Sequence, residues 1–163
     1  MKYKIVVFMI SLGTILLGTT SIAFAGNKGL PAHQGQSSNV LTVFKTPNCG
    51  CCANHVAFLR AKKFDVTVVD LDQEELDKKK RELGVPPSVD SCHTTVADSR
   101  NYFIEGHMPY EAIESLLSEK LDIRGISLPG MPSASPGMPG GKTGPFIIRQ
   151  VSHEGIVSPF MVL

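Results

Sequence analysis

The chain contains, at residues 40–52, the stretch Val40-Leu41-Thr42-Val43-Phe44-Lys45-Thr46-Pro47-Asn48-Cys49-Gly50-Cys51-Cys52. Its first part is short, apolar and rich in β-branched residues, which is typical of a buried β-strand. Pro47 breaks this pattern, and from about Cys52 apolar residues recur at helical spacing, at Val56 and Leu59. The pattern predicts a strand that turns directly into a helix, with three cysteines at the turn.

Strand and helix signals alternate in the rest of the chain. Asp72 and Glu75 resemble a capping box that opens a helix, and Gly84 is suited to end it. The expected elements are a strand at 64–71, a helix at 72–83, a hairpin from 94–96 and 102–104, and an amphipathic helix that begins at Pro109. The order β-α-β-α-β-β-α predicts an α/β, thioredoxin-like domain, followed by a Gly/Pro/Met-rich loop and one added strand. In a right-handed β-α-β unit the cysteines then lie at the helix N-terminus, beside the end of the first strand.

The first 25 residues have the features of a secretory signal peptide. Lys2 and Lys4 precede a largely apolar run at 5–17, and Ala23-Phe24-Ala25 forms a cleavage site before Gly26. The run is too short for a membrane span, which needs about 20 apolar residues. We therefore expect export, with the periplasm as the destination, and no membrane attachment after cleavage. The expected organisation is a signal peptide at 1–25, a disordered polar leader at 26–39, a metal and redox domain at 40–151 and a C-terminal tail at 152–163.

Composition and charge exclude several classes of function. Hydrophobic residues make up 42% of the chain and charged residues 19%, which indicates a folded core rather than disorder. When Lys2 and Lys4 are removed from the 16 basic residues, against 15 acidic ones, the formal net charge changes from +1 to −1. Bulk charge therefore supports neither nucleic-acid binding nor attraction to a membrane surface.

The four cysteines are Cys49, Cys51, Cys52 and Cys92. In an exported domain four cysteines usually form two disulfides. Three of these cysteines lie within four residues, however, so a disulfide between any two of them would close only a short loop. Cys49 and Cys52 have the C-x-x-C spacing of dithiol redox motifs, and a helix N-terminus lowers a thiol pKa, so Cys49 is the candidate for the most thiolate-like group. Cys51 would compete in a simple dithiol exchanger, whereas several thiolates suit Cu(I), zinc or an iron-sulfur centre.

Cys92 precedes the third expected strand. The expected topology places that loop opposite the N-terminus of the first helix, which would bring Cys92 to the other cysteines. The alternative is a buried thiol that acts as a small hydrophobe.

Further candidate ligands lie downstream. Residues 125–145 contain six Gly, five Pro and three Ser and show no helix or strand pattern. Within them Pro129-Gly130-Met131-Pro132 recurs as Pro136-Gly137-Met138-Pro139, and Pro-Gly favours a type II turn that would present each thioether. The methionines are either soft ligands for Cu(I) or gap fillers in the core. The remaining candidates are His93, His107 and Met108.

Three other histidines carry no definite assignment. His55 follows Cys52 by three residues on the expected helix, so it either ligates or tunes the site, or lies on the surface. His33 and His153 lie in segments whose sequence patterns assign no structure or role to them.

Several of these segments together resemble the CopG family. The segments are Thr46-Pro47-Asn48-Cys49-Gly50-Cys51-Cys52, Ser91-Cys92-His93-Thr94, Ile104-Glu105-Gly106-His107-Met108-Pro109 and the two Pro-Gly-Met turns. The resemblance spans about Val40 to Val151. It implies a periplasmic, thioredoxin-like copper-resistance protein that handles copper through its cysteines and interchanges Cu(I) and Cu(II). The four cysteines carry over directly, whereas the family often has an aromatic residue in place of His55.

The leading hypothesis is a copper-binding redox protein, closest to a copper oxidoreductase, in which four thiolates hold a small Cu(I) cluster. Cys49 and Cys52 would carry the redox chemistry, with copper ions, and other periplasmic copper-handling proteins, as the expected partners. Three alternatives stay open: a non-catalytic copper buffer or chaperone, a metal-free thiol-disulfide oxidoreductase, and a structural zinc site of cysteines and His93.

Overall fold

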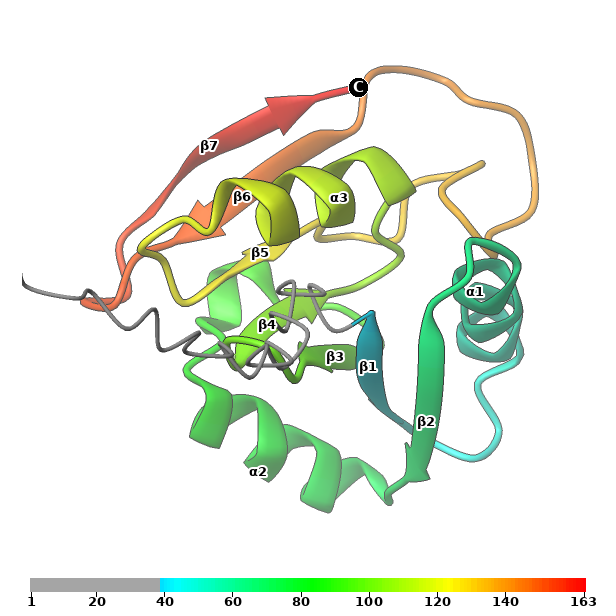
Figure 1. The fold of residues 1–163 in the computed structure, drawn as a ribbon. Coiled ribbons are helices and arrows are strands. Elements are labelled where there is room, and N and C mark those ends of the chain that lie inside the picture. The colour runs from blue at the N-terminus through cyan, green and yellow to red at the C-terminus, as the bar shows by residue number, and fades with distance from the viewer. Residues whose placement is uncertain (1–38) are drawn as a thin grey trace, which may run out of the picture. The chain divides into compact units, whose positions relative to one another are not determined.

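The computed structural model describes residues 39–163, so the expected signal peptide and nearly all of the polar leader lie outside the described residues. Seven strands form one sheet in the order β2-β1-β3-β4-β5-β6-β7 (Figure 1). The strands are β1 (Val40–Lys45), β2 (Asp65–Asp70), β3 (Thr94–Ala97), β4 (Tyr102–Glu105), β5 (Gly125–Ser127), β6 (Ile147–Val151) and β7 (Val157–Val162). The helices are α1 (Gly50–Ala61), α2 (Gln73–Leu83), α3 (Tyr110–Glu119) and the short 3-10 helix η1 (Pro87–Val89).

The first four strands and three α-helices form the predicted thioredoxin-like core. β1 pairs parallel with β2, as a β-α-β crossover through α1 requires, and antiparallel with β3, which forms the predicted hairpin with β4. Leu41 and Val43 alternate along β1 toward the core, where they join Val56 and Leu59 of α1. The alternation therefore sets the face of β1 on which α1 packs.

β4 separates two hydrophobic clusters. Tyr102 and Ile104 belong to the main cluster with residues of α1 and α3, whereas Phe103 between them belongs to a second cluster with Leu83 at the end of α2 and Val151 of β6. Successive side chains of a strand point to opposite faces of the sheet. Both faces of β4 are therefore buried, which holds the loop after β4 in a fixed position.

Local signals define the ends of the helices. In α2 the Asp72 carboxylate accepts from the backbone N–H of Glu75, the Glu75 carboxylate accepts from that of Asp72, and Gly84 has a left-handed φ of 78°, so the predicted caps are confirmed. α1 begins two residues earlier than expected because the sulfur of Cys49 itself caps it.

The C-terminal part departs from the prediction. Residues 125–127, expected to be irregular, form β5, which pairs parallel with β4 and antiparallel with β6. The stretch 152–163, expected as a tail beyond the domain, contains β7, which pairs with β6. The core is therefore extended by three strands rather than one. β5 is only three residues long, so its sequence shows no hydrophobic alternation. Backbone pairing with β4 and β6 defines it as a strand.

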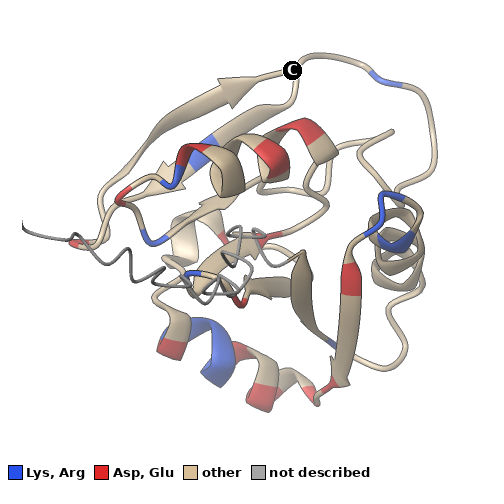
Figure 2. Cartoon of the chain, in the orientation of Figure 1, with Lys and Arg blue, Asp and Glu red and all other residues tan. Residues whose placement is uncertain are grey.

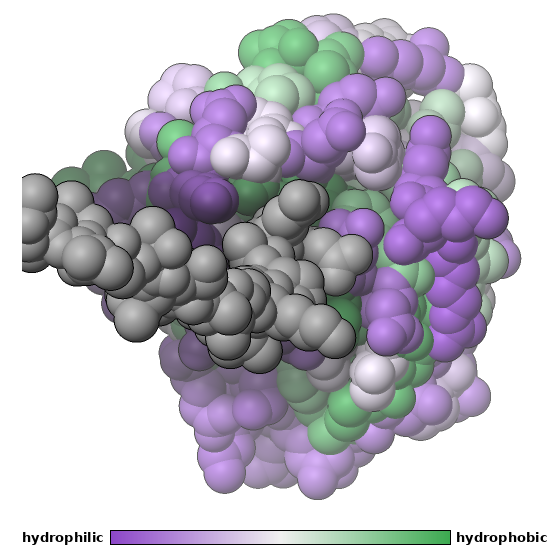
Figure 3. All heavy atoms as spheres, viewed as in Figure 1, coloured by the Kyte–Doolittle hydropathy of each residue, from purple (hydrophilic) through white to green (hydrophobic). Residues whose placement is uncertain are grey.

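Charged residues are concentrated on α2, where they follow one another along the helix (Figure 2). In the space-filling view hydrophilic side chains lie over α2 at the bottom, and hydrophobic ones gather at the top near the C-terminal end of β7, where Val162 is exposed (Figure 3). Within residues 39–163 we find no helix that is both long and apolar enough to span a bilayer.

A buried ion pair ties α2 to the loop before β3. The ammonium of Lys80 donates to Asp90, to the backbone carbonyl of Ser91 and, over 2.9 Å, to Glu105 Oε1. Glu105 Oε1 also accepts from the backbone N–H of Ser91 at 2.8 Å, while Oε2 has no partner among the described residues. Burial raises the pKa of Glu105 to about 7, because the nearby Lys80 offsets the desolvation only in part. One ammonium thus anchors the residue that precedes Cys92.

We expect Lys80→Met to destabilise the metal-free, oxidised protein by about 3–5 kcal/mol at pH 8, because the buried Glu105 must then either stay charged without its cation or take up a proton. The pKa of Glu105 in the folded protein lies above its ordinary value, so the stability associated with its neutral form is lost as the pH rises through 7. The loss caused by Lys80→Met should therefore be smaller at pH 5 than at pH 8. Urea unfolding at both pH values measures this difference.

The matched control is Lys78→Met, two residues away on the exposed side of α2, which we expect to change stability by no more than about 0.5 kcal/mol. An equal loss for Lys80→Met at both pH values would contradict a charged Glu105 as the cause.

Candidate metal and thiol site

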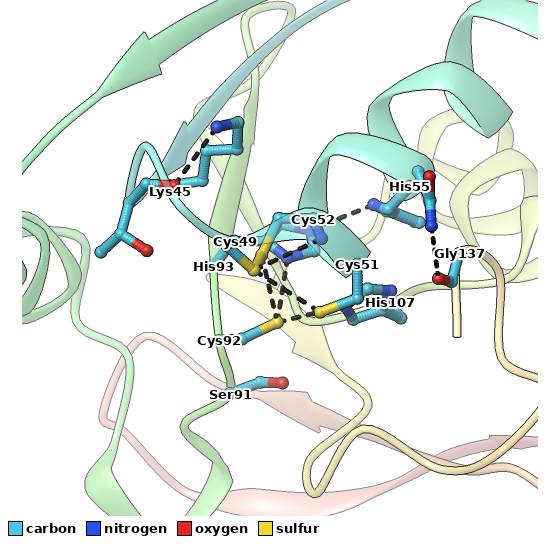
Figure 4. Close-up of a disulfide and its surroundings, with 12 residues drawn as sticks. Lys45, Cys49, Cys51, Cys52, His55, Ser91, Cys92, His93, His107 and Gly137 are labelled. Atoms are coloured by element: carbon cyan, nitrogen blue, oxygen red, sulfur yellow. Dashed lines mark hydrogen bonds between the residues drawn. A yellow bond between two sulfur atoms is a disulfide. The ribbon is translucent and has the colours of Figure 1, made fainter. Parts of the chain in front are cut away.

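Three cysteines lie at the N-terminus of α1 (Figure 4). Cys49 occupies the N-cap position, where its sulfur accepts from the backbone N–H of Cys52 at 3.3 Å, and it is joined to Cys52 by a disulfide. Cys51 is a free, partly exposed thiol whose Sγ lies 3.5 Å from Cys49 Sγ. The unpaired N–H groups of the first helical turn favour negative charge here, so this position stabilises a thiolate once the disulfide is reduced.

Cys92 reaches the same place from the loop between η1 and β3. Its Sγ lies 3.6 Å from Cys52 Sγ, and the ligand atoms of all four cysteines lie within 4.8 Å of one another. The thioredoxin-like topology predicted from the sequence places Cys92 here. The thiol of Cys92 is half buried. Desolvation is the main cause that raises its pKa to about 12, and the nearby Cys51 is the second cause. Without a metal Cys92 is therefore a protonated thiol at neutral pH.

Two histidine rings face the sulfur of Cys92. His93 Nδ1 lies 3.3 Å from Cys92 Sγ and His107 Nε2 lies 3.1 Å from it. Both rings are buried, and desolvation lowers the pKa of each below its ordinary value, so both are neutral at pH 7. Cys52, Cys92, His93 and His107 form a second set whose ligand atoms all lie within 4.8 Å of one another.

His55 stands behind His93, on the side away from Cys92. Its Nδ1 lies 3.0 Å from His93 Nε2, and its Nε2 lies 3.2 Å from the backbone carbonyl of Met108. The ring is fully buried, and desolvation lowers its pKa to about 4. The sequence left open whether His55 lies on the surface, and the structure shows that it does not. Its spacing from Cys52 on the buried face of α1 was the only signal for this placement.

The Gly/Pro-rich loop contacts the site through its backbone. The carbonyl of Pro136 lies 2.7 Å from His107 Nδ1, and the amide of Met138 donates to the carbonyl of Ser135 at 2.8 Å, which closes the expected turn. Gly137 has a φ of 89°, and a Cβ there would lie 2.6 Å from the backbone nitrogen of His55, so only glycine fits against α1. The sequence did not point to Pro136, since a carbonyl contact leaves no residue-type pattern.

The other predicted ligands lie as follows. The Met108 side chain is fully buried in the main hydrophobic cluster, Met131 is 38% exposed, and Met138 is partly buried in the turn beside α1. His153 is exposed and lies 3.2 Å from Asp122 Oδ1, and His33 lies outside the described residues. Among the residues described, the close contacts between candidate ligands thus involve the four cysteines, His93 and His107, with His55 in contact with His93.

Two family models match successive parts of the chain. Residues 41–86 match the glutaredoxin family, which covers β1 to the end of α2, and residues 89–138 match a family described as a protein of unknown function, DUF411. No curated protein sequence matches the chain significantly. The glutaredoxin match agrees with the thioredoxin-like core.

Two solved structures resemble about three quarters of the chain. The structure of copper resistance protein CopG in form 2 is 35% identical, with a TM-score of 0.68, and the match covers 76% of this chain and 97% of that one. Form 1 is 34% identical, with a TM-score of 0.65, and the match covers 76% and 96%. Similarity at this identity over nearly the full length of the relatives confirms the resemblance found in the sequence. The chain belongs to the CopG family of copper resistance proteins.

Proposed function

We propose that this chain is an exported copper-binding protein that holds Cu(I) on its four cysteines and interchanges Cu(I) and Cu(II). The observation that carries the proposal is the overlap of two donor sets of different character. One consists of four sulfurs, the other contains two imidazole nitrogens, and both include Cys52 and Cys92.

The all-sulfur set suits Cu(I). Thiolates are soft ligands, and sulfurs within 4.8 Å of one another at a helix N-terminus are close enough to bridge neighbouring ions in a small cluster. This set is complete only when Cys49 and Cys52 are reduced. Cu(I) retention is therefore expected in the dithiol state.

The mixed set suits Cu(II). Cys92, His93 and His107 offer one sulfur and two imidazole nitrogens, and they stay available while Cys49 and Cys52 form a disulfide. Imidazole is a harder donor than thiolate and is a common ligand of Cu(II). These three donors can thus hold a copper ion in the disulfide state, when the four-sulfur set is incomplete.

The redox step balances between copper and the Cys49–Cys52 pair. When the two thiols form the disulfide they release two protons to solvent and two electrons, and these electrons reduce two Cu(II) ions to Cu(I). In the reverse direction two Cu(I) ions give two electrons to the disulfide and become Cu(II), and the disulfide takes up two protons from solvent and becomes two thiols. The disulfide at the N-terminus of α1 supports this assignment, because a helix N-terminus stabilises the thiolate that exchange requires.

We also propose the periplasm as the location. The signal-like residues 1–25 support export, and an oxidising compartment permits the Cys49–Cys52 disulfide. Copper ions, and other copper-handling proteins of that compartment, are then the partners.

Anaerobic titration of the reduced protein with Cu(I) should yield a cluster with sulfur-only coordination and short copper-copper distances in X-ray absorption. Cys51→Ser and Cys92→Ser each remove a bridging ligand, and we expect each to weaken Cu(I) binding by more than about 10-fold. His153→Ser, which removes an exposed histidine far from the cysteines in sequence, should bind Cu(I) as the natural protein does. A mononuclear site with nitrogen ligands, or tight binding of one zinc with no response to Cu(I), would refute the cluster.

Reduced protein mixed anaerobically with Cu(II) should produce two Cu(I) ions for each Cys49–Cys52 disulfide. A Cu(I)-specific chelator measures the first quantity, and alkylation followed by mass spectrometry locates the thiols that have been lost. Cys49→Ser cannot form this disulfide, whereas Cys51→Ser should still form it. If Cu(II) binds and all four thiols remain, the protein is a copper buffer or chaperone without redox turnover.

A further inference from the structure

We propose that His55 is a positioning residue that holds the ring of His93 in the tautomer whose Nδ1 is unprotonated and faces Cys92. The inference rests on the proposed function, because the unprotonated nitrogen is the one that would bind copper. His55 acts through His93 and is not itself a ligand.

The proton positions follow from a chain of hydrogen bonds that begins at a backbone carbonyl. The carbonyl of Met108 can only accept, so His55 Nε2, at 3.2 Å, must carry a hydrogen. A neutral imidazole carries only one, so His55 Nδ1 is an acceptor. His93 Nε2, 3.0 Å away, is then the donor, which leaves His93 Nδ1 without a hydrogen.

A second chain fixes the other ring independently. The carbonyl of Pro136 accepts from His107 Nδ1 at 2.7 Å, which leaves His107 Nε2 without a hydrogen. The thiol of Cys92 therefore lies between two unprotonated imidazole nitrogens, His93 Nδ1 at 3.3 Å and His107 Nε2 at 3.1 Å, and can donate its single hydrogen to only one of them at a time. A metal ion that replaces this hydrogen can bind one thiolate sulfur and the lone pairs of two imidazole nitrogens.

Burial makes the role of His55 necessary. His55 and His93 are both fully buried, so water cannot replace His55 as the acceptor for the outer N–H of His93. Without that acceptor the favoured tautomer of His93 carries its hydrogen on Nδ1, where it can donate to the sulfur of Cys92. That hydrogen would occupy the position that a metal ion needs. Both nitrogens of His55 are already used, one by Met108 and one by His93, which excludes His55 as a ligand in this arrangement.

The test compares His55→Phe with His55→Asn in the metal-free, oxidised chain. Phenylalanine keeps a flat ring but offers no acceptor, whereas the asparagine side-chain oxygen can accept at nearly the position of Nδ1. Long-range proton–nitrogen NMR at pH 7 reports which nitrogen of each histidine ring carries the hydrogen. We expect His93 to carry it on Nε2 in the natural protein and in His55→Asn, and on Nδ1 in His55→Phe. His153→Phe, which removes an exposed histidine, should leave the signals of His93 unchanged.

Metal binding supplies the second readout. Co(II), which does not oxidise thiols, probes the set of Cys92, His93 and His107 in the oxidised protein. We expect His55→Phe to weaken Co(II) binding by about 10–100-fold and His55→Asn to restore most of it. Cu(I) binding by the reduced cysteines should differ little between the two variants, which separates positioning from a general loss of structure.

The inference is overturned if His93 carries its hydrogen on Nδ1 in the natural protein, or if His55→Phe leaves the tautomer unchanged. The first measurement needs no variant, so it decides the question even if His55→Phe folds poorly. If the natural protein ignores copper while His93 shows the expected tautomer, the proposed function fails and the positioning by His55 stands.

Discussion

The ammonium of Lys80 lies buried beneath the loop that carries Cys92, and that loop depends on it. Lys80 binds Asp90, the carbonyl of Ser91 and the carboxylate of Glu105, and Glu105 in turn binds the amide of Ser91. Removing Lys80 would leave Glu105 buried without a cation, which is far more costly than breaking an ion pair at the surface. The pair therefore determines where the backbone of residues 90–92 lies. Through that backbone it also sets the distance between Cys92 and the N-terminus of α1.

Cys92 connects two chemical environments. On one side lie the sulfurs of α1, and on the other the nitrogens of His93 and His107. Burial keeps His93 and His107 neutral, so the lone pairs that face Cys92 are available at pH 7 without loss of a proton to solvent. A site that contains soft sulfur and imidazole donors side by side is suited to an ion that changes its charge and its ligand preference together.

The long loop between β5 and β6 shapes the site through its backbone. Its carbonyl at Pro136 orients His107, and its glycine at 137 allows the backbone to lie directly against the first turn of α1. The second Pro-Gly-Met turn, at residues 136–138, thus has a structural reason in its proline and its glycine.

Much of the fold and part of the site follow from interactions between residues that are close in sequence. The alternation in β1, the capping box of α2, the left-handed glycine at 84 and the cysteines at the N-terminus of α1 all have local causes, and each was predictable. β5 and β7 were not predicted, because the first is too short to show a period and the second, which contains Pro159, is held by pairing with β6.

The histidine arrangement required the folded chain. His55 and His93 are 38 residues apart, and His107 is oriented by a carbonyl 29 residues away. Only packing of α1 against the loops before β3 and after β4 brings these groups to one sulfur. The sequence alone determined that this chain concentrates thiols at a helix N-terminus, because a strand, a turn and a helix in succession place them there. Tertiary packing determined which imidazole nitrogens face those thiols, because ring orientation depends on hydrogen-bond acceptors contributed by distant backbone.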